Sequence, residues 1–333
     1  MTDRVLAPPL GVERLASYLS RTLNSRSGKQ PAAATPTDWM LDCTLISGLG
    51  LNLKETLSYV FNEAPSLEAF ERWILEKNGG AIERERITRL NAAMTGNLER
   101  TAPVSEEPVL DSAALTSFEE NGYVVLHDAV PASQCVAAEA AIWEYLRLDP
   151  ADPSSWRASP LGASIWVPLI HHPALDANRH APRVRRAFEQ LWGRSDLWPV
   201  IDQTGFNPPE RADWSFPGPD LHWDVSLTPP VPFGLQGVLS VTDTAADQGA
   251  FTCVPGFHRG LDAWVASLPP GADARRQDLR SLGAVPVPGR AGDLVIWHQG
   301  LPHGSSPNHA TRPRIVQYLT LRPTVWEEHA EWR

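Results

Sequence analysis

Cysteine is scarce in this chain of 333 residues, and its scarcity argues against two classes of protein. Cys43, Cys135 and Cys253 are scattered and odd in number, so they indicate neither a disulfide framework nor a cysteine zinc site. Because free cysteine is usually buried, we interpret all three as packing residues. Stability must therefore come from a hydrophobic core, for which an apolar content of 42% is sufficient.

Long apolar runs and basic clusters are absent as well. No segment reaches the roughly 18 apolar residues of a membrane span, and the start, "MTDRVLAPPLGVERLASYL", lacks the regions of a secretory signal. The formal net charge is -10, and no cluster of Lys and Arg could follow a phosphate backbone. We therefore predict a cytoplasmic protein that binds neither nucleic acid nor membranes, with its oligomeric state open.

Glycine and proline are abundant, with 23 and 31 residues, and they favour turns and short strands. Residues 1–37 show little pattern and contain a polar, proline-bearing stretch that is typical of a linker, so we expect a partly flexible N-terminal segment. Helical patterns fill residues 38–104, with a helix start at Ser66 and a stop at Gly79. In residues 105–333 a helical start gives way to short apolar or alternating runs, which are typical of a barrel or a two-sheet jelly roll.

The stretch "LHWDVSL" carries a pair of metal-capable side chains. If it forms a strand, His222 and Asp224 point to the same face, where buried polar groups need a partner. His303 follows another apolar strand pattern, 79 residues after Asp224. Two histidines and one carboxylate can form a facial triad, which leaves coordination positions open for chemistry. A closed structural zinc site would need a fourth protein ligand, and no residue with suitable spacing is evident.

Four stretches in order carry a resemblance to a known family: "SFEENGYVVLHDAV", "LHWD", "DQGAFTCVPGFHRG" and "GDLVIWHQGLPHGSSPNHATRPRIVQYL". From about Leu115 to Pro323 the chain resembles the phytanoyl-CoA dioxygenase family of Fe(II)/2-oxoglutarate-dependent oxygenases. The resemblance implies an α+β fold for residues 105–333: a double-stranded β-helix, which is a cupin-like jelly roll, with flanking helices. It does not cover the helical N-terminal region. "PGFH" departs from the family's "PGSH" at Phe257, which leaves the metal site unaffected.

The resemblance also implies the site residues. It implies three metal ligands, which are His222, Asp224 and His303. It implies an arginine eleven residues after the distal histidine, where a planar guanidinium can bind the far carboxylate of 2-oxoglutarate with two parallel bonds. That residue is Arg314; Arg312 shares its face by strand parity and is the alternative, but the spacing favours Arg314. Gln203 and Thr204, on the first barrel strand, are further candidates for 2-oxoglutarate binding.

Candidate substrate contacts come from segments that should frame the mouth of the barrel. They are Trp166, Trp214, Phe216, Gln236 and His298. Trp223 lies between the two proximal ligands and should point to the opposite face, so we interpret it as core packing. We interpret His258 in "PGFH" as a residue that structures its loop.

Taken together, these features predict an Fe(II)/2-oxoglutarate-dependent dioxygenase that hydroxylates an unactivated C–H bond of a small molecule and releases succinate and CO2. Its cofactors are then Fe(II) and 2-oxoglutarate, with O2 as the oxidant, and desaturation or cyclisation are related outcomes. Two alternatives stay open: a metal-dependent hydrolase or isomerase on a jelly roll, and a non-catalytic jelly-roll binding module. The carboxylate-binding arginine argues against the first, and an intact triad argues against the second. The identity of the substrate does not follow from the sequence.

Overall fold

The computed structural model describes residues 3–26, 28, 35–98, 107–157, 164–212, 214–329 and 331–332. The chain divides into two compact units. The first comprises Met1–Val104, Trp192–Ile201 and Leu321–Ala330, and the second comprises Ser105–Leu191, Asp202–Thr320 and Glu331–Arg333. Both later segments of the first unit fall within residues 105–333, the range predicted to form the jelly roll. Residues 27 and 29–34, within the stretch interpreted as a linker, lie outside the described residues.

The first unit is mainly helical. Its helices are α1 (Leu15–Arg26), α2 (Pro36–Gly48), α3 (Leu53–Glu63), α4 (Leu67–Lys77) and α5 (Arg84–Met94). The predicted start of α4 is confirmed, because the Ser66 hydroxyl accepts a hydrogen bond from the Ala69 N–H at 3.2 Å. Two short antiparallel pairs complete the unit: β1 (Arg4–Val5) with β2 (Ile82–Glu83), and β5 (Leu197–Pro199) with β13 (Leu321–Pro323). A core that includes Phe70, Ile74 and Leu90 holds the helices together.

The second unit combines helices with antiparallel sheets. Its helices are α6 (Ser112–Asn121), α7 (Ala132–Leu146), α8 (Pro173–Arg179), α9 (Pro182–Trp192) and α10 (Leu261–Ser267), and its 3-10 turns are η1 (Ser155–Arg157), η2 (Phe257–Arg259), η3 (Ala274–Arg276) and η4 (Arg280–Leu282). Helix α6 ends at Gly122, whose φ of 77° suits glycine. Among the described residues, no helix has both the length and the apolarity needed to cross a bilayer.

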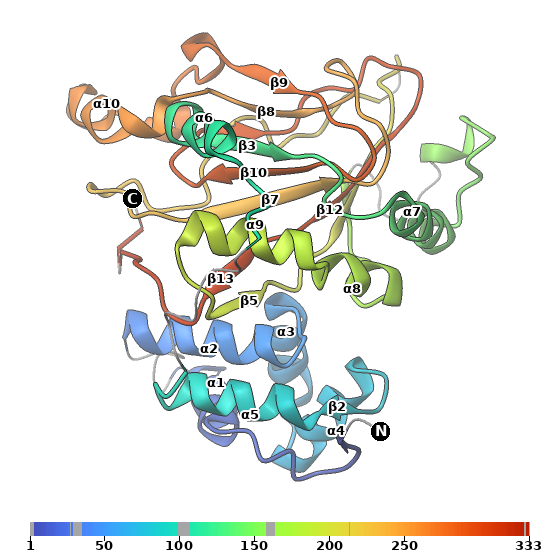
Figure 1. The fold of residues 1–333 in the computed structure, drawn as a ribbon, viewed down its shortest axis with the longest axis vertical. Helices are drawn as coiled ribbons and strands as arrows, with labels where there is room; N and C mark the ends of the chain where they lie inside the picture. The colour runs from blue at the N-terminus through green and yellow to red at the C-terminus, as the bar shows by residue number, and fades with distance from the viewer. Residues whose placement is uncertain are drawn as a thin grey trace. The chain divides into compact units, whose positions relative to one another are not determined.

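Two antiparallel sheets form the centre of the second unit (Figure 1). The larger sheet has the order β3-β10-β7-β12-β6-β4, with β3 (Tyr123–Leu126), β10 (Leu294–His298), β7 (Leu235–Ser240), β12 (Arg314–Tyr318), β6 (Thr204–Asn207) and β4 (Trp166–Val167). The smaller sheet has the order β11-β8-β9, with β11 (His303–Gly304), β8 (Phe251–Cys253) and β9 (Val285–Val287). The mixture of helices and antiparallel sheets agrees with the predicted α+β class.

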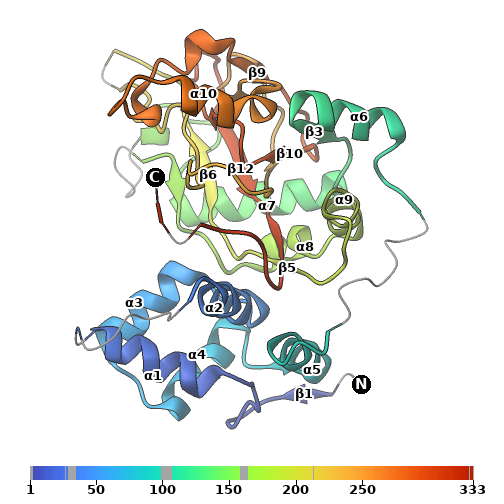
Figure 2. The same cartoon turned by 90° about the vertical axis from the view of Figure 1, so that its left-hand side faces the viewer.

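Alternation along β12 shows how the larger sheet is covered on its two faces. Ile315 packs into a cluster with residues of α7 and α8, whereas its neighbour Val316 packs into a cluster with Phe251 and Val287 of the smaller sheet. Helices therefore cover one face and the smaller sheet covers the other, an arrangement that Figure 2 shows from a second side. Cys253 is buried between the two sheets, as expected for a packing cysteine.

The prediction that "LHWDVSL" is a strand is wrong. The segment is an extended loop that makes a single bridge to β11, through His222 and His303. Prolines at positions 217, 219, 229 and 230 flank it, and their missing N–H groups prevent a longer ladder. Alternation survives nonetheless, because Trp223 is fully buried while the residues on either side of it are not. The same-face argument for the pair of ligands therefore holds without a strand.

Candidate metal centre and cofactor cavity

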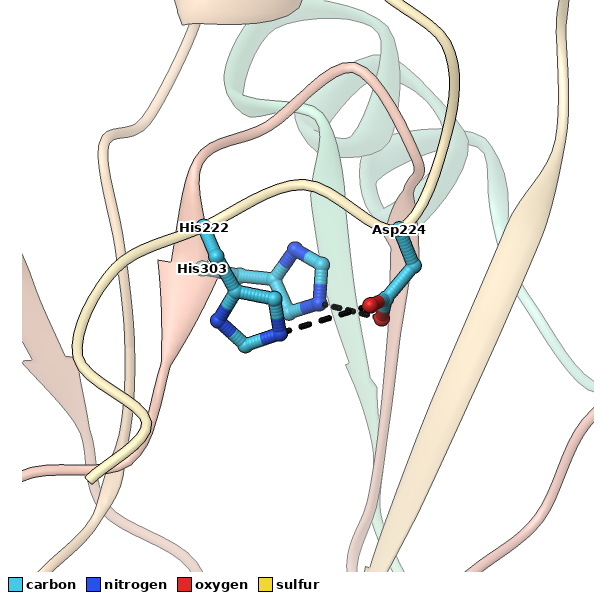
Figure 3. Close-up of side chains that lie close together, drawn as sticks. All are labelled: His222, Asp224 and His303. Carbon is cyan, nitrogen blue, oxygen red and sulfur yellow. Dashed lines mark ion pairs between the residues drawn. The ribbon is translucent and has the colours of Figure 1, made fainter. Parts of the chain in front are cut away.

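Three potential metal ligands meet at the junction between the loop and β11 (Figure 3). The His222 N–H donates to the His303 carbonyl at 2.9 Å, and the reverse bond measures 3.0 Å, so the two backbones are locked side by side. The Nε2 atoms of His222 and His303 lie 3.5 Å and 3.4 Å from the two carboxylate oxygens of Asp224. One ligand atom from each residue lies within 4.8 Å of the others, a cluster suited to a single metal ion.

Both imidazoles are oriented by backbone carbonyls. His222 Nδ1 lies 2.8 Å from the Asp220 carbonyl, and His303 Nδ1 lies 3.0 Å from the Leu301 carbonyl. A carbonyl can only accept, so each Nδ1 carries the proton and each Nε2 presents a lone pair to the centre. Such outer contacts are the usual way in which a protein fixes the tautomer of a metal-binding histidine.

Electrostatics favours an ionised carboxylate at the centre. Burial alone would raise the pKa of Asp224, but contacts with His222, His303 and Gln236 hold it well below its usual range. For His222, burial alone would lower the pKa, yet the Asp224 carboxylate and the Asp220 carbonyl together raise it. The Asp224 carboxylate is therefore ionised, as a metal ligand must be.

A cavity of about 180 Å³ surrounds the three ligands. Its aromatic walls are Trp166, Phe251, Trp297 and Tyr318, and its polar lining includes Asp202, Gln203, Ser305 and Thr320. Gln236 Oε1 and Trp297 Nε1, from paired positions on β7 and β10, are buried without a hydrogen-bond partner among the described residues. Unsatisfied polar atoms in a cavity are the mark of a place for a polar ligand.

Arg314 brings a buried positive charge to the same cavity. It begins β12, is only 4% exposed, and donates from Nη1 to the Ser305 hydroxyl at 3.0 Å. Burial lowers the pKa of its guanidinium, and contact with Tyr318 opposes that shift. Within the described part of the chain Arg314 makes no ion pair, and a buried cation without an anion is costly. Arg312, the alternative, is exposed.

The other residues predicted to bind 2-oxoglutarate or substrate occupy different places. Trp166, Gln203 and Gln236 line the cavity. Gln236 donates from Nε2 to the Asp224 carboxylate at 2.8 Å, so its amide already serves a candidate ligand. Thr204 lies fully buried in the sheet, where its hydroxyl donates to the Val167 carbonyl at 3.4 Å.

Three predicted substrate contacts lie away from the residues that line this cavity. Trp214 is in a loop, where its backbone bridges to Arg211. Phe216 lines a separate hollow of about 700 Å³. His298 follows the cavity-lining Trp297 on β10, so alternation directs it to the opposite face, where its ring lies 5.0 Å from that of His258. The order of segments in the sequence predicts which of them frame the barrel, but it does not give the direction of individual side chains.

Sequence reasoning missed several cavity residues, of which two had a usable signal. Tyr318 lies four residues after Arg314 on one strand, and Ser305 lies two residues after His303, so strand alternation places each on the face of a predicted site residue. Asp202 and Phe251 had no comparable signal, because long-range pairing of strands brings them to the cavity.

Comparison with known proteins identifies one family. The model of the family described as Phytanoyl-CoA dioxygenase (PhyH) matches residues 118–316, which is more than half of the chain. A protein of Dictyostelium discoideum whose name assigns it to phytanoyl-CoA dioxygenase is 23% identical over 258 residues, covering 62% of this chain and 74% of the relative.

Solved structures give weaker similarities. The epimerase SnoN from nogalamycin biosynthesis, in complex with Fe3+, alpha ketoglutarate and nogalamycin RO, is 18% identical, with a TM-score of 0.45 over 63% of this chain and 82% of SnoN. EctD from S. alaskensis, with 2-oxoglutarate and 5-hydroxyectoine, is 22% identical, with a TM-score of 0.45 over 67% of this chain and 82% of EctD. At such low TM-scores neither likeness carries an argument about function.

Proposed function

Because the chain belongs to the phytanoyl-CoA dioxygenase family of Fe(II)/2-oxoglutarate-dependent oxygenases, we propose that it hydroxylates an unactivated C–H bond of a small molecule. Enzymes of this family use Fe(II), 2-oxoglutarate and O2, and the products of the proposed reaction include succinate and CO2. Desaturation and cyclisation are related reactions, and the substrate would decide which of the three takes place.

One observation carries this proposal: a three-ligand cluster and a buried arginine without an ion pair share one cavity. In the proposal, His222, Asp224 and His303 hold Fe(II), and their neutral imidazoles and ionised carboxylate are the donors that this ion accepts. When bound, the iron supplies the oxidising chemistry, together with O2 and the keto acid. Three protein ligands leave room for both.

Other residues of the cavity bind and orient 2-oxoglutarate in this proposal. Arg314 pairs with the far carboxylate of 2-oxoglutarate, and the hydroxyls of Ser305 and Tyr318 hold its guanidinium in place. Gln203 adds a polar contact from the wall of the cavity, and Thr204 supports it from within the sheet. A hydrolase or isomerase with the same three ligands would have no use for a buried, carboxylate-binding arginine.

Substrate binding is proposed for the aromatic and amide walls. Trp166, whose ring lies 4.8 Å from that of Tyr318, offers a flat apolar surface, and the unpaired Gln236 Oε1 offers an acceptor. Phe251 and Trp297 exclude water from the metal, which confines the oxidation to the bound molecule. These contacts suit a small molecule with both apolar and polar parts.

We also propose that the two antiparallel sheets are the two faces of a double-stranded β-helix. Packing of Val238, Val295 and Val316 against Phe251 and Val287 supports this, because it forms one core between the sheets. The predicted triad bridges them, with His303 on the smaller sheet and Gln236, from the larger sheet, bonded to Asp224.

The test of the proposed function is an anaerobic absorption titration with Fe(II) and then 2-oxoglutarate. A visible band should appear only when both are present. Arg314→Gln should need roughly 100-fold more 2-oxoglutarate to produce it, because removal of one partner of a buried ion pair costs about 3 kcal/mol or more. Arg312→Gln is the matched control and should behave like the wild type. Bound metal without a band would contradict the proposal and favour the hydrolase, isomerase or binding-module alternatives.

A further inference from the structure

Arg275 lies against the loop that carries two of the proposed metal ligands. It belongs to the 3-10 turn η3, and its guanidinium donates from Nη1 to the Trp223 carbonyl and from Nη2 to the Val225 carbonyl, both at 2.6 Å. These two carbonyls flank Asp224 in the chain. The planar fork of arginine therefore spans the residue whose carboxylate faces His222 and His303.

Arg280, from the next turn, η4, holds the other end of the loop. It donates from Nε to Asp220 at 3.0 Å, and its Nη2 lies 2.6 Å from the second oxygen of the same carboxylate. The Asp220 carbonyl is the acceptor that orients His222, at 2.8 Å from Nδ1. Both arginines thus contact residues that set the position of a ligand side chain.

Few other hydrogen bonds fix this loop. It makes one bridge to β11, and its packing comes from alternate residues, Leu221, Trp223 and Val225, which are buried in a cluster with Ala274 and Leu279 on either side of Arg275. The Trp223 indole donates to the Gly300 carbonyl at 3.0 Å. Apolar packing sets the depth of the loop, while the carbonyls that a neighbouring strand would satisfy are satisfied by a side chain.

Residues 331–332 contact both Arg275 and the ligand loop. The ring of Trp332 lies 4.9 Å from the Arg275 guanidinium, and the Ser226 hydroxyl donates to the Glu331 carbonyl at 2.8 Å. An aromatic face over a guanidinium restricts the directions in which that group can point. The Arg275 guanidinium is therefore held by two loop carbonyls and by the ring of Trp332.

We propose that Arg275 and Arg280 are positioning residues that hold the ligand loop in its metal-binding conformation. The inference rests on the proposed function, since it assumes that His222, Asp224 and His303 bind the metal. Arg275 acts on Asp224 through the two adjacent peptide groups, and Arg280 acts on His222 through Asp220. Arg275 has the larger role, because it is partly buried and makes two bonds to backbone, whereas the pair of Arg280 and Asp220 is exposed.

The experiment measures Co(II) affinity and the Co(II) absorption spectrum of the metal-free protein, without substrate or turnover. Arg275→Gln should weaken Co(II) binding about 10- to 100-fold and change the shape of the ligand-field bands, as is typical when a contact that orients a ligand is lost. Arg280→Gln should weaken it by roughly 2- to 5-fold, as an exposed pair allows. Arg276→Gln is the control, because that neighbouring side chain is 86% exposed, and it should match the wild type.

Arg275→Lys separates positioning from folding. Lysine keeps the charge but can reach only one of the two carbonyls well, so its affinity should fall between those of the wild type and Arg275→Gln, with an unchanged thermal midpoint. Wild-type Co(II) affinity and spectrum in both Arg275 variants would overturn the proposed positioning role of Arg275. His303→Ala distinguishes the other failure: if it binds Co(II) as the wild type does, the triad and the proposed function are overturned, together with the inference.

Discussion

The two sides of the candidate metal centre are built in different ways. His303 is buried on β11, where pairing with Cys253 of β8 fixes its backbone. The side chains of His222 and Asp224 are 32% and 49% exposed and stand on a loop with a single bridge. One side therefore takes its geometry from a sheet, and the other takes it from hydrophobic anchors and arginine bonds. The comparison teaches that a precise site can combine a rigid element with a loop that the rest of the fold must hold.

The largest effects should come from removing one ligand on each side. His303→Ala and Asp224→Ala should both abolish metal-dependent succinate formation, because each removes a proposed ligand. They should differ in the stability of the metal-free protein. His303→Ala leaves a cavity in the core and should lower the free energy of unfolding by about 2–4 kcal/mol, whereas Asp224→Ala truncates a half-exposed side chain and should lower it by less. Urea unfolding measures the difference, and equal losses would break the comparison.

Gly304 tests the close contact between β11 and the ligand loop. A Cβ added there would lie 2.7 Å from the Asp220 carbonyl oxygen, which is backbone of the loop. Gly304→Ala should therefore push the loop away from β11, lower the free energy of unfolding by about 2 kcal/mol and weaken metal binding.

Gly260→Ala is the matched control for that change. Its added Cβ would meet only the Phe257 carbonyl oxygen, at 4.0 Å, and its thermal midpoint and metal affinity should stay near the wild-type values. If Gly304→Ala kept both values as well, the close approach of loop and strand would have no role in the site.

A smaller effect should appear when the protein is exposed to acid. Burial, aided by His258, lowers the pKa of His298 at the end of β10 to about 4, against about 6.5 in an unfolded chain. The unfolded state then binds more protons between these values, so stability should be full well above pH 6.5 and fall steadily as the pH drops towards 4.

His298→Gln should flatten this acid dependence in urea unfolding measured from pH 7 to pH 4. His309→Gln, at a side chain that is 63% exposed, should keep the wild-type slope. An unchanged slope in His298→Gln would show that acid acts on stability through another group, of which the neighbouring His258 is the first to examine.

Spacing in the sequence was enough to bring the three ligands together, although for a partly mistaken reason. The prediction used the alternation of a strand, and the loop keeps that alternation because Leu221, Trp223 and Val225 are apolar and buried. Arg314 came from the family resemblance, which implies an arginine eleven residues after the distal histidine, and it is the first residue of β12. Periodic burial and a fixed connection length are local properties, so a sequence can display them.

The residues that hold the loop could not be predicted in the same way. Arg275 and Arg280 follow His222 and Asp224 by about 50 residues, and they bond to backbone carbonyls and to one exposed carboxylate. A carbonyl is present at every position, so such a contact leaves no preference in the sequence of the loop. The directions of His298 and Trp214 could not be predicted either, because distant packing decides the path of a connecting loop.

The alternation of the ligand loop separates two duties that usually compete. Its odd-numbered residues, Leu221, Trp223 and Val225, do the packing, and its even-numbered residues, His222 and Asp224, face the centre. A change at an even position should alter which ions the proposed metal site prefers and should leave the buried cluster intact. The loop is thus open to evolution, and to redesign, in its chemistry while its path through the protein stays the same.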